Sequence, residues 1–187
     1  TVTREIYGYE ALVRWFHPVR GAVPPTVFIP VAEKIGLINA LGEWVLKTAC
    51  AEAASWATPL KVSVNVSPIQ LMNTSLTDTI ISVLQQTGLD PRRLDLEITE
   101  SDVFNENTRS LEILSQLREQ GIQISIDDFG TGYSSLSRLS YFPFDKIKID
   151  RSFVINIPEQ KDDLDIVRLI ISMGKSLHMR IVAEGVE

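Results

Sequence analysis

The chain has 187 residues, of which 44% are hydrophobic and 22% are charged, and its formal net charge is −6. This length is typical of one domain with a sizeable core, and the acidic balance argues against a protein that binds DNA or RNA through its phosphates. No run approaches the roughly 18 apolar residues of a membrane span, and no signal peptide opens the chain, so we expect a cytoplasmic domain without membrane contact of its own, whatever anchors its parent protein.

Strand-like and helix-like patterns alternate along the whole chain. Strands are predicted at residues 7–13, 60–66, 94–99, 122–127, 146–149 and 180–184. A short helix is predicted after Thr26, which we expect to be its N-cap. Longer helices are predicted over residues 37–56, about 76–84 and 164–177. Two more are predicted around Leu111 to Leu117, and around Leu136 and Leu139 before Pro143. Glycines at positions 36, 88 and 121 mark helix ends.

The scarcity of zinc ligands restricts the metal chemistry that the chain can support. The single cysteine, Cys50, excludes an intrachain disulfide, and its alanine-rich helical surroundings predict a buried structural thiol. The two histidines, His17 and His178, do not form the usual His/Cys zinc site. Any metal ion should therefore be held by oxygen ligands.

The predicted strands alternate apolar and polar residues instead of forming continuous apolar runs. In residues 62–67, for example, three valines alternate with two serines and an asparagine. An open parallel sheet with helices on both faces would bury both faces of its central strands. A closed (β/α) barrel explains the pattern better, because the aliphatic side chains face the helices and the polar ones face the barrel interior.

This alternation places one polar group near the carboxyl end of each of six strands: Glu10, Asn65, Glu97, Asp127, Lys148 and Glu184. Active sites of parallel barrels lie at that end. For any one of these residues a surface acid or a structural ion pair is the simpler interpretation, but six coincidences of strand position and face favour a shared site.

Carboxylates that converge in this way require protons or cations among them. All-oxygen ligands with one amide suit Mg²⁺, Mn²⁺ or Ca²⁺, and adjacent Asp127 and Asp128 could hold two ions, as in phosphate-ester hydrolysis. Lys148 should be charged and could orient a water molecule. Arg14, on the same face as Glu10 and Leu12, could bind a phosphate oxygen.

With these residues assembled, the chain resembles the EAL domain family of cyclic-di-GMP phosphodiesterases. The family motif stands here as Glu10-Ala11-Leu12, followed by Val13-Arg14-Trp15. Further matching segments follow in family order: Asn65-Val66-Ser67-Pro68, Glu97-Ile98-Thr99-Glu100-Ser101, Asp127-Asp128-Phe129-Gly130-Thr131-Gly132, Lys148-Ile149-Asp150 and Ala183-Glu184-Gly185-Val186-Glu187.

The resemblance implies a modified TIM-type (β/α)₈ barrel that hydrolyses cyclic di-GMP to linear pGpG with Mg²⁺ or Mn²⁺, two ions in all, and that excess Ca²⁺ inhibits. It implies that Glu10, Asn65, Glu97 and Asp127 ligate one ion, and that Asp127, Asp128 and Glu184 hold the second. Lys148 contacts the hydrolytic water, Glu184 doubles as a general base, and Leu12 and Arg14 touch the substrate. Glu100 supports the loop from Phe129 to Ser135, through which we expect a homodimer.

The resemblance also implies that residues 1–187 are an EAL domain truncated at both ends, without its first strand and its last helix and strand. A catalytically silent cyclic-di-GMP receptor is the main alternative function. A weaker alternative is a metal-dependent barrel enzyme that acts on another phosphoester, and only the carboxylate pattern supports it.

Overall fold

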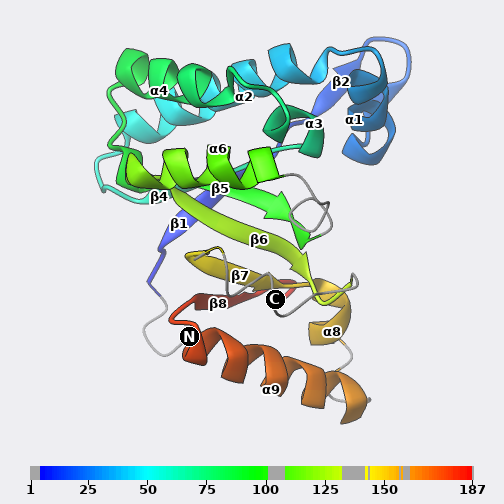
Figure 1. Cartoon of the computed structure of the whole chain (residues 1–187). Coiled ribbons are helices and arrows are strands. Elements are labelled where there is room, and N and C mark those ends of the chain that lie inside the picture. Colours follow the sequence, from blue (N-terminus) through cyan, green and yellow to red (C-terminus); the bar gives the residue numbers. More distant parts are fainter. Residues whose placement is uncertain are drawn as a thin grey trace. The chain divides into compact units, whose positions relative to one another are not determined.

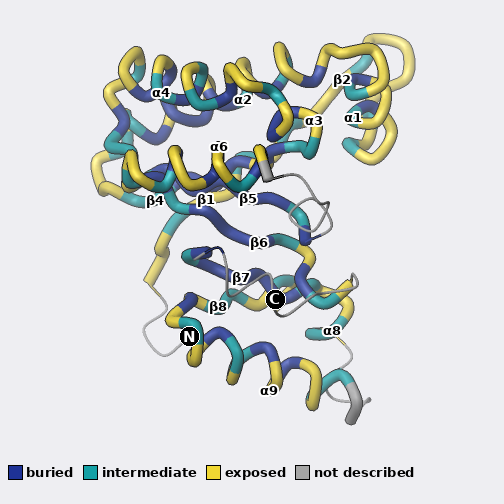
Figure 2. Tube along the Cα trace, viewed as in Figure 1, coloured by how far each residue is buried: buried dark blue, intermediate teal, exposed yellow. Residues whose placement is uncertain are grey.

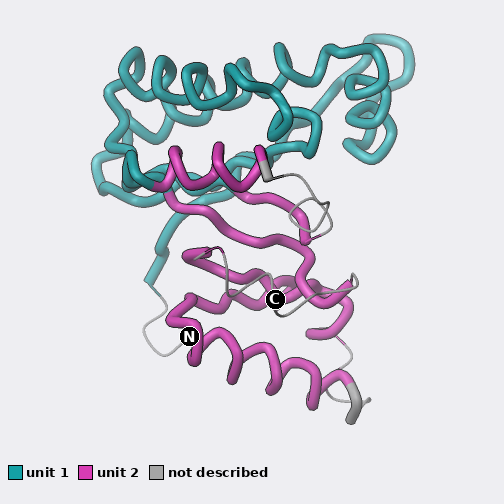
Figure 3. The backbone as a smooth tube through the Cα atoms, in the orientation of Figure 1, with its two compact units in different colours: residues 1–96, 119–122 teal, residues 97–118, 123–187 magenta. Residues whose placement is uncertain are grey.

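The structure is a computed structural model, and it describes residues 5–100, 108–131, 142, 144–155, 157 and 161–186. Strands and helices alternate along the described chain (Figure 1). The chain divides into two compact units, Thr1–Leu96 with Glu119–Ile122, and Glu97–Arg118 with Gln123–Glu187 (Figure 3).

Unit 1 contains a parallel strand pair and most of the helices in the first half of the chain. Strand β1 (Gly8–Ala11) pairs in parallel with β4 (Lys61–Asn65), with Glu10 opposite Ser63. Strands β2 (Trp15–His17) and β3 (Gly21–Val23) form a separate antiparallel hairpin. The helices are α1 (Pro25–Lys34), α2 (Ile38–Ser55), α3 (Pro68–Leu71), α4 (Leu76–Thr87) and the 3₁₀ helix η1 (Pro91–Arg93).

The core of unit 1 lies where α2 packs on α4 and β4. The α2 residues Leu46, Cys50 and Ala53 are buried, as are Ile80 of α4 and Val64 of β4 (Figure 2). These α2 positions recur every three or four residues, so they lie on one face of the helix. The amphipathic pattern therefore explains why α2 covers the strand pair.

Among its described residues, unit 2 has three complete parallel strands and three helices. Strand β7 (Lys146–Ile149) lies between β6 (Gln123–Phe129) and β8 (Arg180–Ala183) and is parallel to both. Helix α6 (Thr108–Glu119) precedes β6, and α8 (Arg151–Ile155) and α9 (Lys161–Ser176) connect β7 to β8. Asp145, just before β7, accepts hydrogen bonds from the backbone N–H of Ile124 and from the Arg118 guanidinium, and so fixes the start of the strand.

Strand β5 (Leu94–Thr99) passes from unit 1 to unit 2 after Leu96. The hydrogen-bonded order of the strands in the sheet is β1-β4-β5-β6-β7-β8. This order follows the sequence, as expected when each crossover connects neighbouring parallel strands. All six predicted strands are present, and β5 and β7 have the predicted bounds.

The helix predictions are confirmed for α2, α4, α6 and α9, and Gly88 ends α4 in the left-handed conformation with φ of 71°. The predicted N-cap Thr26 is wrong, because α1 begins at Pro25 with Pro24 as its cap. Proline is favoured at the first helical position, since the N–H that it lacks would have no partner there. The helix predicted around Leu136 and Leu139 lies outside the described residues.

Candidate metal centre

The Lys148 ammonium lies among three carboxylates of unit 2. Its Nζ is 2.7 Å from Glu97 Oε2, 2.8 Å from Glu184 Oε1 and 3.0 Å from Asp127 Oδ1. The Lys148 side chain is 7% exposed and that of Glu97 only 1%. Burial alone lowers the pKa of Lys148, but the contacts with Glu97, Glu184 and Asp127 together raise it above its ordinary value, so the residue is charged as predicted.

Strand alternation produces this convergence. Glu97, Asp127 and Lys148 belong to the polar faces of β5, β6 and β7, whereas their neighbours Ile98 and Ile126 are buried aliphatic residues of the opposite faces. Successive side chains of a strand point to opposite faces. The predicted alternation of apolar and polar faces is therefore confirmed for these strands.

A second group of carboxylates forms where β6 and β8 end. One carboxylate oxygen from each of Asp127, Asp128 and Glu184 lies within 4.8 Å of the others. Asp128 has a left-handed backbone, with φ of 51°, and its N–H donates to Asp127 Oδ1 over 3.1 Å. The left-handed residue interrupts the strand alternation, which is how two consecutive aspartates reach the same site.

Asp150 lies beside this group and interacts with the Asp128 side chain. Partial burial, together with the negative charges of Asp127 and Asp150, raises the pKa of Asp128 above its ordinary value. Hydrogen bonds from the hydroxyl and N–H of Ser152 lower the pKa of Asp150. Negative charge thus accumulates at the ends of β6 and β7, which favours a cation there.

The donors in unit 2 fit a divalent ion. Glu97, Asp127, Asp128 and Glu184 carry four negative charges when ionised, Asp150 beside them adds a fifth, and the ammonium groups of Lys146 and Lys148 balance two of these charges. The remaining excess of negative charge favours divalent cations. Carboxylate oxygens are the preferred ligands of Mg²⁺, Mn²⁺ and Ca²⁺, so the group suits a hard ion.

Unit 1 brings together two more of the predicted ligands. Asn65 Nδ2 donates to Glu10 Oε1 over 2.8 Å, and both residues are exposed. Glu10 and Asn65 belong to unit 1, whereas Glu97 and Asp127 belong to unit 2. That these four residues share one ion therefore stays a prediction.

The two predicted substrate contacts are exposed residues just beyond β1. That strand ends at Ala11, so the alternation of faces does not extend to Leu12 and Arg14 as the sequence suggested. Leu12 is 52% exposed, and Arg14 Nη1 donates to the carbonyl oxygen of Val13 over 3.1 Å. Their contact with substrate stays a prediction.

Glu100 holds the start of the loop that follows β6. This residue is buried, and its Oε2 accepts a hydrogen bond of 2.8 Å from the backbone N–H of Gly130. Gly130 has φ of 102°, and a Cβ atom there would lie 2.8 Å from Cε2 of Phe153 in α8. Glu100 thus contacts the start of the loop at Gly130, and its support of the loop as far as Ser135 stays a prediction, since residues 132–141 lie outside the described part of the chain.

Sequence reasoning missed a second lysine of the site, Lys146. Its Nζ lies 3.2 Å from Glu97 Oε1, and its side chain is 11% exposed. The signal that could have found it is its position two residues before Lys148, on the same face of the strand. A buried lysine requires an acidic partner, and the alternation points it toward the other polar side chains.

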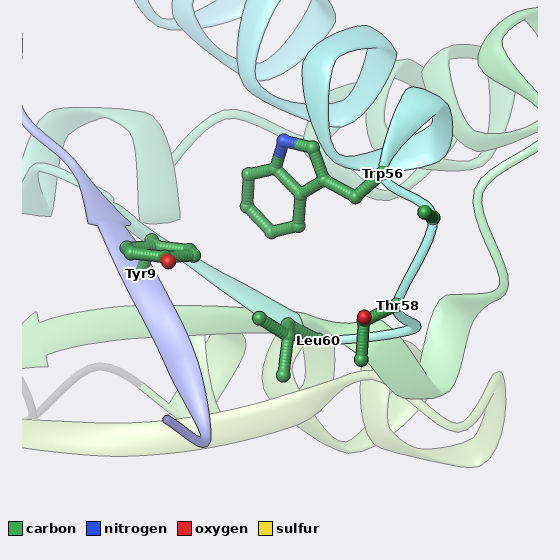
Figure 4. Close-up of a pocket in the computed structure, with 5 residues that line it drawn as sticks. Tyr9, Trp56, Thr58 and Leu60 are labelled. Atoms are coloured by element: carbon green, nitrogen blue, oxygen red, sulfur yellow. The ribbon is translucent and has the colours of Figure 1, made fainter. Parts of the chain in front are cut away.

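Unit 1 also has a hollow lined by Tyr9, Trp56, Ala57, Thr58 and Leu60 (Figure 4). The rings of Tyr9 and Trp56 meet edge to face, with their centroids 5.2 Å apart. No carboxylate, lysine, arginine or histidine is among the described residues that line the hollow. Tyr9 neighbours Glu10 in β1, so their side chains lie on opposite faces, and the hollow is separate from the ligand pair of unit 1.

Comparison with known proteins gives a consistent result. A family profile described as the EAL domain matches residues 1–187. The chain is 57% identical over 183 residues to a signaling protein of Caulobacter vibrioides, a match that covers 98% of this chain and 23% of that protein. It is 43% identical over 187 residues to the cyclic di-GMP phosphodiesterase NbdA of Pseudomonas aeruginosa, which covers 98% of this chain and 24% of NbdA. The chain thus spans about a quarter of the length of these relatives.

Solved structures show the same similarity. The structure described as the PaMucR phosphodiesterase in complex with c-di-GMP has a TM-score of 0.93 and 44% sequence identity, and the match covers 98% of this chain and 76% of that one. Together with the alternating parallel strands and helices, this confirms the predicted fold class, part of a modified TIM-type (β/α)₈ barrel. No helix among the described residues is long and apolar enough to cross a bilayer.

Proposed function

The chain belongs to the EAL domain family, and we propose that it hydrolyses cyclic di-GMP to linear pGpG with Mg²⁺ or Mn²⁺. The observation that carries the proposal is the group of charged residues around Lys148 at the family's motif positions. Glu97, Asp127 and Glu184 all contact its ammonium group. The acidic residues expected from the family motifs are therefore present, and these three lie together around one lysine. The matched relatives NbdA and MucR bear names that state a cyclic di-GMP phosphodiesterase activity.

In this proposal Glu10, Asn65, Glu97 and Asp127 would hold one ion, and Asp127, Asp128 and Glu184 would hold a second. A bound divalent ion supplies Lewis-acid stabilisation of the phosphoryl oxygens and lowers the pKa of a bound water. Lys148 orients the hydrolytic water by its ammonium group, and Glu184 accepts the proton that the water loses. Leu12 and Arg14 position the substrate, the arginine through a phosphate oxygen.

The test is incubation of the chain with cyclic di-GMP and Mg²⁺, Mn²⁺ or Ca²⁺ in turn, followed by separation of products. We expect pGpG with Mg²⁺ or Mn²⁺ and inhibition by excess Ca²⁺. Glu10→Ala and Asp127→Asn should each reduce turnover by more than about 100-fold, since even outer-shell partners of metal ligands are worth 10- to 100-fold. Glu43→Ala and Asp78→Asn, at exposed helix positions, are the matched controls.

Undiminished turnover in Glu10→Ala or Asp127→Asn would refute this assignment. Tight binding of cyclic di-GMP without pGpG in any metal would favour the receptor function instead. We also propose a homodimer formed through the loop that follows Asp128, and size-exclusion chromatography with light scattering tests it. A monomer at micromolar concentration would contradict the dimer without affecting the proposed hydrolysis.

A further inference from the structure

Two separate ammonium groups contact the two oxygens of one buried carboxylate. Lys146 Nζ lies 3.2 Å from Glu97 Oε1, and Lys148 Nζ lies 2.7 Å from Glu97 Oε2. Both lysines come from β7, two residues apart, and Glu97 is 1% exposed. Charge-assisted hydrogen bonds in such a water-poor environment are strong and fix the orientation of the acceptor.

The Lys148 ammonium has further carboxylate partners besides Glu97. Lys148 Nζ is also 3.0 Å from Asp127 Oδ1 and 2.8 Å from Glu184 Oε1. Lys148 would therefore keep carboxylate partners if Glu97 Oε2 were to face a cation. Lys146 contacts the other oxygen, so this contact persists while Oε2 exchanges its partner.

We propose that Lys146 is a positioning residue that restricts Glu97 to donating one oxygen, and that it thereby favours Mg²⁺ and Mn²⁺ over Ca²⁺ at this site. The inference rests on the proposed function, because it assumes that Glu97 is a metal ligand. Mg²⁺ requires near-octahedral coordination by six ligands, whereas Ca²⁺ takes six to eight oxygens and readily accepts both oxygens of a carboxylate. A cation that bound both oxygens of Glu97 would approach the positive charge of Lys146, which contacts Oε1, so Lys146 disfavours Oε1 as the second ligand.

The test compares Lys146→Met with the unchanged chain by calorimetric titration of the metal-free protein with MgCl₂ and with CaCl₂. The methionine keeps the length and apolar stem of lysine but frees Oε1. We expect the ratio of the Ca²⁺ and Mg²⁺ dissociation constants to fall about tenfold, at the lower end of outer-shell effects on metal sites. The calcium-induced shift of the melting temperature should increase in parallel.

Lys61→Met is the matched control, because Lys61 lies on β4 and its Nζ contacts the carbonyl oxygen of Arg92 at 2.8 Å instead of a carboxylate. It should leave the ratio unchanged, and Lys146→Arg, which retains a cationic donor, should preserve it as well. If circular dichroism shows that Lys146→Met does not fold, Lys146→Leu carries the same comparison, because leucine also lacks a donor.

An unchanged ratio in a folded Lys146→Met protein overturns the inference and leaves the proposed function intact. Equal weakening of both ions shows a purely structural role and overturns it as well. If the unchanged chain binds neither ion, the metal-dependent function and the inference fail together. A selective gain for Ca²⁺ with the control unchanged supports the inference.

Discussion

Asn65 Nδ2 donates a hydrogen bond to Glu10 Oε1 over 2.8 Å, and so connects the carboxyl ends of two neighbouring parallel strands. An asparagine in this position has two functions, since its amide nitrogen holds Glu10 while its oxygen remains available to a cation. An aspartate would retain the oxygen and lose the donor.

We therefore expect Asn65→Asp to reduce kcat/KM for cyclic di-GMP by at least about tenfold, although it keeps an oxygen ligand, because Glu10 would be repelled instead of held. Hydrolysis assays over a range of Mg²⁺ concentrations measure this. Asn73→Asp is the control, since its side-chain oxygen accepts from Ser75 in either form. Turnover equal to that of the unchanged chain would contradict the role given to the amide.

Removal of the Glu100 carboxylate should destabilise unit 2. Glu100→Ala leaves the half-buried Gly130 N–H without the acceptor that it has at 2.8 Å, and we expect a loss of about 1 kcal/mol, the lower end of the cost of an unpaired buried donor. Glu100→Gln keeps an acceptor oxygen and should lose less. Urea unfolding of both variants measures the difference, and equal free energies of unfolding would argue against this contact.

Gly130→Ala should lower the free energy of unfolding for two reasons that can be separated. The residue has φ of 102°, which an L side chain rarely adopts, and the added Cβ would meet the ring of Phe153. We expect a loss of about 1–3 kcal/mol from the backbone alone. In a Phe153→Leu background, Gly130→Ala should reduce the free energy of unfolding by less than it does in the unchanged chain. The difference corresponds to the clash with the ring. Strict additivity in this double-mutant cycle would rule out the clash.

Asp90 makes a pH-dependent contribution to the stability of unit 1. Its carboxylate accepts from the Arg92 backbone N–H at 3.0 Å and from Arg92 Nη2 at 2.6 Å, and the Arg92 hydrogen bonds lower the pKa of Asp90 from 3.8 to about 2. Because the folded-state pKa is the lower one, the stabilisation is present above about pH 4 and disappears as the pH falls toward 2.

Asp90→Asn should thus lower the melting temperature slightly at pH 7 and have less effect at pH 3. The pair is exposed, so 0.5 M NaCl should reduce the difference at pH 7. A difference that grows toward acid pH would mean that another group is responsible.

The sequence predicted the strands and the polar faces well because a two-residue alternation is read directly from the letters. Glu97, Asp127 and Lys148 were assigned to one site by this alternation, and the structure places them within ion-pair distance. Short elements without such a period were missed, namely the β2–β3 hairpin, α3 and α8. Asp128 reaches the site through a left-handed backbone, which aspartate adopts more readily than most residues but which its identity alone does not predict at this position.

The role of Lys146 was missed for a different reason. Alternation gives the face of a strand, but it does not give the depth at which a side chain lies along that face. Glu97 could contact Lys146, Lys148 or both. The outcome depends on the register between strands that are far apart in the sequence. That register results from packing of the whole core and is not contained in any single strand.

Cys50 is the only cysteine of the chain; it is 0% exposed, and burial raises the pKa of its thiol to about 11. A thiol reagent should therefore react with it only when α2 opens, so that the labelling rate measures local unfolding of unit 1, with no signal from unit 2. The labelling rate of Cys50 can therefore test, without substrate, whether the predicted ligands of the two units bind the same ion. If Glu10 and Asn65 bind the same ion as Glu97 and Asp127, Mg²⁺ should slow the labelling of Cys50, and Glu10→Ala should abolish that protection.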